Sequence, residues 1–130
     1  MTAKLKSAAR VLALAAAFLT GCAALPERPA SPGEGESLLR AGVAAYEDGD
    51  LKTADQRLTA ALRAGLADKD RVTAYKYLAF INCSTGREQQ CREDFVAALA
   101  IDPGLQLSPA EAGHPVWGPI FKNVKAQRAR

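Results

Sequence analysis

The sequence predicts an all-α protein, and three observations support this prediction. Only 6% of its 130 residues are aromatic, which disfavours a sandwich of strands rich in aromatic and β-branched residues. From residue 37 onward, apolar residues recur every three or four positions, the spacing of one face of an α-helix. Turn-forming residues interrupt this pattern at intervals. The length allows one compact domain, and a 48% hydrophobic content excludes a wholly disordered chain.

Four amphipathic helices are predicted between residues 37 and 103. The first ends at the turn formed by residues 48–50, and the second begins at Asp50 as N-cap and stops at Gly65. The fourth stops at Pro103, because proline cannot continue the hydrogen-bond ladder of a helix. The apolar stripes of the four helices are, in chain order, Leu38, Leu39, Val43 and Tyr46; Leu51, Ala54, Leu58, Ala61 and Leu62; Val72, Tyr75, Leu78, Ala79 and Asn82; and Cys91, Phe95, Ala98 and Leu99.

A shorter C-terminal part is predicted to cover the end of this helical array. Ser108 and Glu111 have the spacing of a capping box, and Pro109 suits the first position of a helix that Gly113 ends. The apolar residues Trp117, Ile120, Phe121 and Val124 then form one face of a last helix. This face predicts a cap over the second helical hairpin. The tail that follows is basic, and we expect it to be solvated.

The two predicted hairpins carry similar residues at the same offsets. Gly49 and Gly86 are 37 residues apart, and the residues that share this offset are Gly42 and Ala79, Tyr46 and Cys83, Ala54 and Cys91, Leu58 and Phe95, and Ala61-Leu62 and Ala98-Leu99. These positions resemble the small, aromatic, turn and packing positions of tetratricopeptide repeats, whose usual period is about 34 residues. Both hairpins lack the early Trp of that family. Over residues 35–103, the resemblance implies two tetratricopeptide-like hairpins followed by a capping helix.

The first 22 residues have the features of a bacterial export signal. Three basic residues precede the apolar residues 11–19, a stretch much shorter than the about 20 residues that a transmembrane helix needs. Leu19-Thr20-Gly21-Cys22 follows and resembles the lipobox of bacterial lipoproteins. The resemblance implies removal of residues 1–21, acylation of Cys22 and, because Ala23 follows, an outer-membrane anchor facing the periplasm. An ordinary secretory signal with an incidental Cys is the alternative.

The mature chain is then predicted to have two parts. Residues 22–36 form the lipidated N-terminus and a flexible tether, because they are rich in Pro, Gly and Glu, and residues 37–130 form the helical domain. Lys4, Lys6 and Arg10 lie in the predicted signal and account for the net charge of +3 of the whole chain. The mature side chains therefore carry no net charge, which gives no argument for a polyanionic partner, and no nucleic acid is expected.

Cys83 and Cys91 form an even pair once Cys22 is lipidated. Export implies an oxidising compartment, and the two positions face each other across a tetratricopeptide-like hairpin. We therefore predict a structural disulfide. A redox-active pair is the alternative, but the spacing is not Cys-x-x-Cys.

The sequence gives little support for an enzyme, a cofactor or a metal centre. His114 is the only histidine, which excludes a metal site with several histidines, and we expect it to pack or form a hydrogen bond in a loop. Hydrolase, zinc-protease and phosphate-binding motifs do not occur. We therefore predict a protein without catalytic activity, cofactor or metal.

The function predicted instead is binding of an envelope protein through the groove of the helical repeat. By offset, six residues would face that groove: Leu39, Val43, Tyr46, Glu47, Lys76 and Phe80. Tyr46 and Phe80 are equally compatible with a place in the core. Residues 107–119 resemble small lipoproteins that accompany envelope secretion systems, type VI systems in particular, which implies an accessory or assembly role. The alternative is a periplasmic module that binds peptidoglycan or a small molecule.

Overall fold

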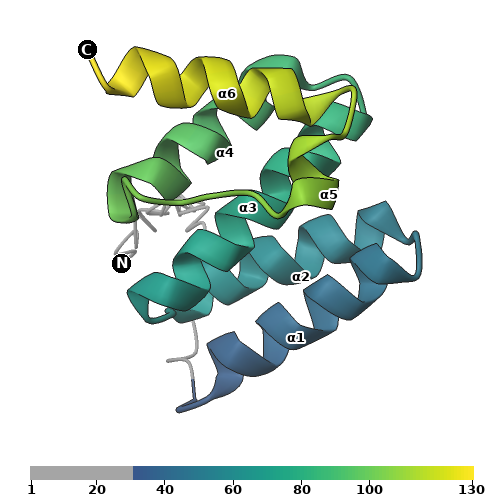
Figure 1. The fold of residues 1–130 in the computed structure, drawn as a ribbon. Coiled ribbons are helices and arrows are strands. Elements are labelled where there is room, and N and C mark those ends of the chain that lie inside the picture. The colour runs from purple at the N-terminus through teal and green to yellow at the C-terminus, as the bar shows by residue number, and fades with distance from the viewer. Residues whose placement is uncertain (1–30) are drawn as a thin grey trace, which may run out of the picture.

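The computed structural model describes residues 31–130, and Figure 1 shows how they are arranged. This part of the chain is all-helical, as the sequence predicts. The helices are α1 (Glu34–Glu47), α2 (Leu51–Ala64), α3 (Asp68–Ser84), α4 (Glu88–Ile101), α5 (Pro109–Ala112) and α6 (Trp117–Arg128). The predicted signal, Cys22 and most of the predicted tether lie outside the described residues.

Helix α1 begins three residues earlier than the sequence pattern suggests. Gly33, with φ of 81°, is its N-cap, and the first turn contains Glu34 and Glu36. Negative side chains at this end interact favourably with the helix dipole. Glu34 also accepts a hydrogen bond from the backbone N–H of Ser31 at 2.8 Å. The polar composition of residues 34–36 predicts that they belong to the tether, but they form the first turn of α1.

Helices α1 and α2 form a tight antiparallel hairpin. The Asp50 carboxylate accepts the backbone N–H of Thr53 at 3.0 Å, so Asp50 is the N-cap that the sequence predicts. Gly42 lies where α1 packs closely on α2, since a Cβ atom there would lie 2.7 Å from Cγ of Leu58. Glycine at this position therefore allows α1 to pack directly against α2.

Helices α3 and α4 repeat this hairpin with an offset of 37 residues. In the first turn, the backbone N–H groups of residues 48, 49 and 50 donate to the carbonyls of residues 44, 46 and 45. In the second turn, those of residues 85, 86 and 87 donate to the carbonyls of residues 81, 83 and 82, an equivalent set. Gly49 and Gly86 both have positive φ, of 81° and 78°. The two hairpins are therefore structural repeats, as the matched offsets predict.

The C-terminal segment returns along the second hairpin and covers it. From the end of α4 the chain runs across α3 to the short helix α5, and α6 then packs on α4 and α3 (Figure 1). Ser108 and Glu111 form the predicted capping box of α5. Trp117, Phe121 and Val124 are buried and Ile120 is partly buried, so α6 is the predicted cap.

Two hydrophobic clusters form the core. One lies between α1, α2 and α3 and includes Leu39, Leu58 and Ile81. The other lies between α3, α4 and α6 and is built around Phe80 and Phe95. Tyr46 and Tyr77 pack against both clusters, so they join the two halves of the molecule.

Candidate functional sites

Two tyrosines lie together where α1 and α3 meet. The ring centroids of Tyr46 and Tyr77 are 5.1 Å apart, with an edge-to-face orientation. Both side chains are partly buried. Burial is the main reason why the pKa of each phenol is raised, and the negative charge of Glu111 adds to this effect for both. Both hydroxyls are therefore neutral hydrogen-bonding groups at physiological pH.

Lys76 connects this aromatic pair to the C-terminal segment. Its Nζ lies 2.6 Å from Oε1 of Glu111 in a partly buried ion pair, and 5.1 Å from the centre of the Tyr77 ring. Partial burial acts to raise the pKa of Glu111, but the hydrogen bonds from Lys76 and from the Ser108 backbone outweigh it and lower that pKa. The cation therefore lies against an aromatic ring and is neutralised by a carboxylate from α5.

The structure separates the six predicted groove residues into two groups. Leu39 and Phe80 are 7% and 1% exposed and belong to the core, so neither side chain is available to a partner. Phe80 is buried because Trp117 stacks on it, with ring centroids 4.6 Å apart. The prediction that these two residues line a groove is corrected: the C-terminal segment covers the part of the α3 face that contains Phe80.

The remaining four residues form part of one surface with Tyr77. Val43 and Tyr46 are partly buried, Glu47 is exposed, and Lys76 is paired with Glu111. We call the set Val43, Tyr46, Glu47, Lys76 and Tyr77 the tyrosine face. Tyr77 is not among the six predicted groove residues, because its position in the helical repeat does not predict that it faces the groove. Its partly buried ring is placed there by the contact between α1 and α3.

The second hairpin contains the predicted disulfide, between Cys83 of α3 and Cys91 of α4. Both residues are buried. The equivalent positions of the first hairpin are Tyr46 and Ala54, so the first hairpin has no bridge at these positions. The bridge joins the two helices on which the C-terminal segment packs.

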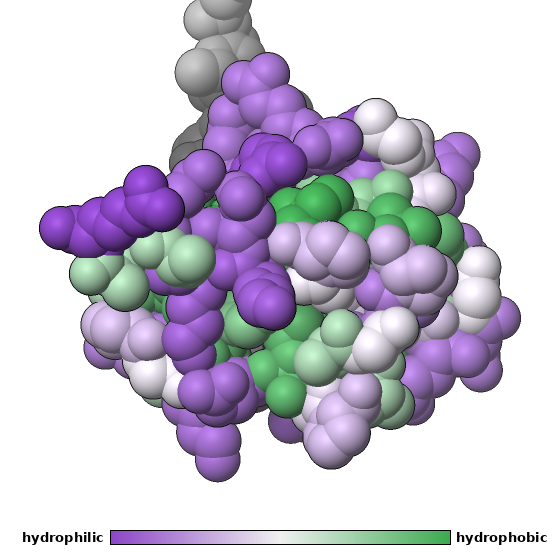
Figure 2. All heavy atoms as spheres, turned by 45° about the horizontal axis from the view of Figure 1, so that its top comes forward, coloured by the Kyte–Doolittle hydropathy of each residue, from purple (hydrophilic) through white to green (hydrophobic). Residues whose placement is uncertain are grey.

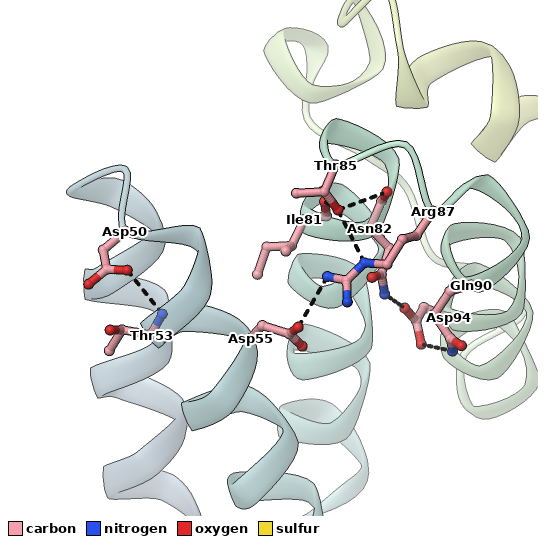
Figure 3. A network of polar contacts seen from close by, with 9 residues as sticks. All are labelled: Asp50, Thr53, Asp55, Ile81, Asn82, Thr85, Arg87, Gln90 and Asp94. Carbon is pink, nitrogen blue, oxygen red and sulfur yellow. Dashed lines mark hydrogen bonds and ion pairs between the residues drawn. The ribbon is translucent and has the colours of Figure 1, made fainter.

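A second candidate site is a polar pocket that the sequence pattern does not predict. Three helices each contribute two side chains spaced four residues apart, and Arg87 is added from the turn before α4. The lining residues are Asp55 and Thr59 of α2, Leu78 and Asn82 of α3, Gln90 and Asp94 of α4, and Arg87. We call this set the polar pocket; its volume is about 210 Å³. Figure 3 shows most of these side chains pointing toward one another from the three helices.

Hydrogen bonds organise the pocket into a buried part and an exposed part. In the buried part, Nδ2 of Asn82 donates to Oδ2 of Asp94 at 2.6 Å, and the two residues are 4% and 6% exposed. In the exposed part, Arg87 lies 3.1 Å from Oδ2 of Asp55 and its Nε donates to the Thr85 hydroxyl at 3.2 Å (Figure 3). Arg87 therefore links α2 to the second hairpin.

The electrostatics of the buried part are unfavourable for a negative charge. Burial raises the pKa of Asp94, and the hydrogen bonds from Asn82 and Gln90 offset this only in part. The nearby carboxylates of Asp55 and Glu93 raise that pKa further. In addition, Oδ1 of Asn82 is buried and accepts no hydrogen bond from the described residues. An unsatisfied buried acceptor costs about 1–3 kcal/mol.

The sequence contains a weak signal for this pocket. Asn82 occupies a position on the apolar stripe of α3, and Asp94 directly precedes the buried Phe95. A polar residue on a buried face needs a partner. Which residues supply it depends on how α2, α3 and α4 pack, and this information is absent from the periodicity of any single helix.

Other candidate features have structural explanations or remain outside the described region. His114 stacks on Trp117, and its Nδ1 accepts the backbone N–H of Val116 at 3.2 Å, as expected for a loop histidine. Within residues 31–130, no three His, Cys, Asp or Glu side chains gather in a way that suits a metal ion. None of the helices described has the length and apolar character needed to cross a membrane. Cys22 lies outside the described residues.

Comparisons with protein-family models, curated proteins and solved structures find no match to the chain. The class of the protein is therefore defined by its architecture: a small all-α domain of two repeated helical hairpins closed by a C-terminal helix.

Proposed function

We propose that this chain is a membrane-anchored scaffold or assembly factor of the bacterial cell envelope, which binds a segment of another envelope protein at the tyrosine face. The observation that carries the proposal is the pair Tyr46 and Tyr77, partly buried at the junction of two helices and flanked by Glu47 and Lys76. Membrane attachment follows from the lipobox-like sequence that ends at Cys22.

The chemistry of the tyrosine face suits protein recognition. Tyrosine offers a large apolar ring and a hydroxyl, and it is enriched at the energetically important positions of protein interfaces. The two rings hold each other in place by their edge-to-face contact. Ordering the face on binding therefore costs little conformational entropy. Glu47 and the ion pair of Lys76 with Glu111 supply polar groups at its rim.

The secretion-system part of the proposal rests on residues 107–119. This segment resembles small lipoproteins that accompany envelope secretion systems, type VI systems in particular. It contributes Glu111 and Trp117, the residues that pair with Lys76 and stack on Phe80. The resemblance is therefore located in the segment that borders the tyrosine face.

Photo-crosslinking in intact cells tests the binding surface. A photoreactive phenylalanine derivative replaces Tyr46 in the full chain, and the matched control carries it at Ala100, an exposed residue of α4. We expect one envelope protein to crosslink at position 46 and not at position 100. Equal crosslinking at both positions would contradict the proposal, and sedimentation of the chain with purified cell wall would favour a peptidoglycan-binding module.

A charge reversal separates binding from folding. Glu47 is exposed, so Glu47→Lys should weaken capture of the crosslinked partner while the melting temperature stays that of the wild type. Glu93→Lys, on the exposed part of α4, is the control and should change neither property. Membrane attachment is tested independently: Cys22→Ser should abolish palmitate labelling and release the chain from the membrane fraction.

A further inference from the structure

The polar pocket contains an acceptor that no part of the described chain satisfies. Oδ1 of Asn82 is buried, belongs to a side chain that is 4% exposed, and lines the pocket. Its orientation is determined by its neighbour, because Nδ2 of the same amide donates to Asp94. Turning the amide around would point its oxygen at the carboxylate. This oxygen therefore has no donor among the described residues, and its side chain lines the pocket.

The charges around this oxygen favour a cation. Asp55 and Asp94 are the acidic lining residues and Arg87 is the basic one, so acidic side chains outnumber basic ones in the pocket. Arg87 occupies only Oδ2 of Asp55 and lies at the exposed end of the pocket, with half of its side chain accessible. Oδ1 of Asp94 has a single long contact, 3.5 Å from Nε2 of Gln90. The carboxylate and amide oxygens thus line one pocket that contains few donors to satisfy them.

The number and type of these oxygens determine which cation suits the pocket. Calcium takes six to eight oxygen ligands and magnesium requires near-octahedral coordination. The lining side chains supply two carboxylates, the amide oxygens of Asn82 and Gln90 and the Thr59 hydroxyl, and no third acidic residue joins them in the described chain. Its volume of about 210 Å³ is below the range typical of sites for drug-sized ligands. A small group with several N–H donors and one positive charge fits these conditions.

We propose that the polar pocket binds a primary ammonium group, with its N–H donors directed to Oδ1 of Asn82 and to the carboxylates of Asp94 and Asp55. An ammonium group has three donors, which matches these three acceptors. Its charge lies next to two carboxylates, so the hydrogen bonds are charge-assisted. The source is either a lysine side chain of a partner protein or a free amine, and both present the same chemistry. The proposal does not depend on the tyrosine face.

An NMR titration of the full chain in detergent tests this binding. The probe is ethylammonium chloride, and tetramethylammonium chloride at equal ionic strength is the control, since it carries the same charge without N–H donors. We expect saturable shifts of the Asn82 and Gln90 side-chain amide signals with ethylammonium only. Equal shifts with both salts, or no saturable shift with ethylammonium, would overturn the proposal. The polar pocket would then be a closed polar contact between helices that binds no ligand.

Two variants test whether the ammonium group binds in the polar pocket. Asp55→Asn removes one charge from a partly exposed position, and we expect roughly tenfold weaker binding, the effect of losing one charge-assisted hydrogen bond. Asp48→Asn removes a charge from the exposed first turn and should leave the affinity unchanged. Equal affinities for the wild type and Asp55→Asn would contradict the assigned acceptors.

A further comparison identifies the source of the ammonium group. Nα-acetyl-lysine methylamide is titrated against its Nε-acetylated form and against ethylammonium. Tighter binding of the lysine derivative than of ethylammonium indicates a lysine side chain, and the reverse order indicates a free amine. If the acetylated form, which has no charge, binds as well as the lysine derivative, the proposal fails. Crosslinking at Tyr46 is unaffected by any of these results, so the two proposals fail independently.

Discussion

Asp94 is a buried carboxylate whose closest partner is the amide of Asn82, not a cation. Burial is the main reason why its pKa lies above the ordinary 3.8. The folded state therefore binds the Asp94 proton more tightly than the unfolded state does. By linkage, this residue makes the free energy of unfolding decrease as the pH rises from about 4 through the raised pKa. Glu111 acts in the opposite direction, because its pKa is lowered and its contribution is lost as the pH falls.

We predict that Asp94→Asn removes the decrease in the free energy of unfolding that Asp94 causes as the pH rises. The difference in the free energy of unfolding between variant and wild type should shift in favour of the variant as the pH rises above 4. Glu111 is present in both proteins, so its contribution cancels in the difference. Urea denaturation at a series of pH values measures this. Parallel pH profiles for the two proteins would show that Asp94 has the same pKa folded and unfolded.

Phe80 and Tyr46 differ in burial although the sequence pattern treats them alike. Phe80 is 1% exposed and lies between Phe95 and Trp117, whereas Tyr46 is only partly buried. We predict that Phe80→Ala costs about 3–5 kcal/mol of stability, the range for a large aromatic side chain removed from a core. Tyr46→Ala should cost clearly less. Chemical denaturation of both variants measures the loss in the free energy of unfolding. Equal losses would place Tyr46 in the core as well.

At the scale of elements, the two hairpins share a turn but hold their helices together differently. The first relies on close contact at Gly42, where a Cβ atom would overlap Leu58. The second has Ala79 at the equivalent position and adds the disulfide between Cys83 and Cys91. A covalent bond across a short loop restricts the unfolded chain.

We predict that Cys83→Ala combined with Cys91→Ala lowers the stability of the domain by about 2–3 kcal/mol, the chain-entropy value for a loop of about nine residues. Reduction of the wild type should produce a similar loss, because it removes the same constraint. Thermal and chemical denaturation measure both. In the native wild type, the two cysteines should resist maleimide labelling until a reductant is added. Ready labelling without reductant would contradict a bridge in the mature protein.

At the scale of the whole molecule, α6 closes the open end of the second hairpin. Figure 2 brings the α6 side of Figure 1 forward and shows hydrophobic side chains between hydrophilic ones on this face. Beneath it, Phe121 contacts Phe95 with ring centroids 5.1 Å apart, and Trp117 covers Phe80. Helical repeats need such terminal caps, because each repeat leaves an apolar face for the next.

We predict that a chain ending at residue 104 loses cooperative unfolding. The deletion uncovers the apolar surface of α3 and α4, so the truncated chain should bind a hydrophobic dye and tend to aggregate. A chain that lacks only residues 129 and 130 is the control and should unfold like the wild type, since both residues are exposed. Calorimetry and dye fluorescence make the comparison. A cooperative transition in the longer deletion would show that two hairpins suffice.

Much of the fold is predictable from the sequence because it depends on local signals. Asp50, Gly65 and the Ser108–Glu111 box act within one turn of the chain, and the apolar spacing reports which side of each helix is buried. The match between the two hairpins also predicts the partners Cys83 and Cys91. The candidate sites are less predictable, because their residues come from different helices. The repeat position of Phe80 is compatible with a groove or with the core, because it cannot report that Trp117 covers the ring.

Local signals therefore indicate where most helices of this protein begin and end, and the repeated pattern indicates how the helices pair and which cysteines are joined. Tertiary structure decides which faces stay accessible. The segment from α4 to α6 returns over α3, buries Phe80 and leaves Tyr46 and Tyr77 at the junction with α1. It is likewise the packing of α2, α3 and α4 that brings Asp55, Asn82 and Asp94 into one pocket. The physical reason is that the periodicity of a helix specifies which of its faces is buried. Which element packs on that face depends on the course of chain segments that are distant in sequence.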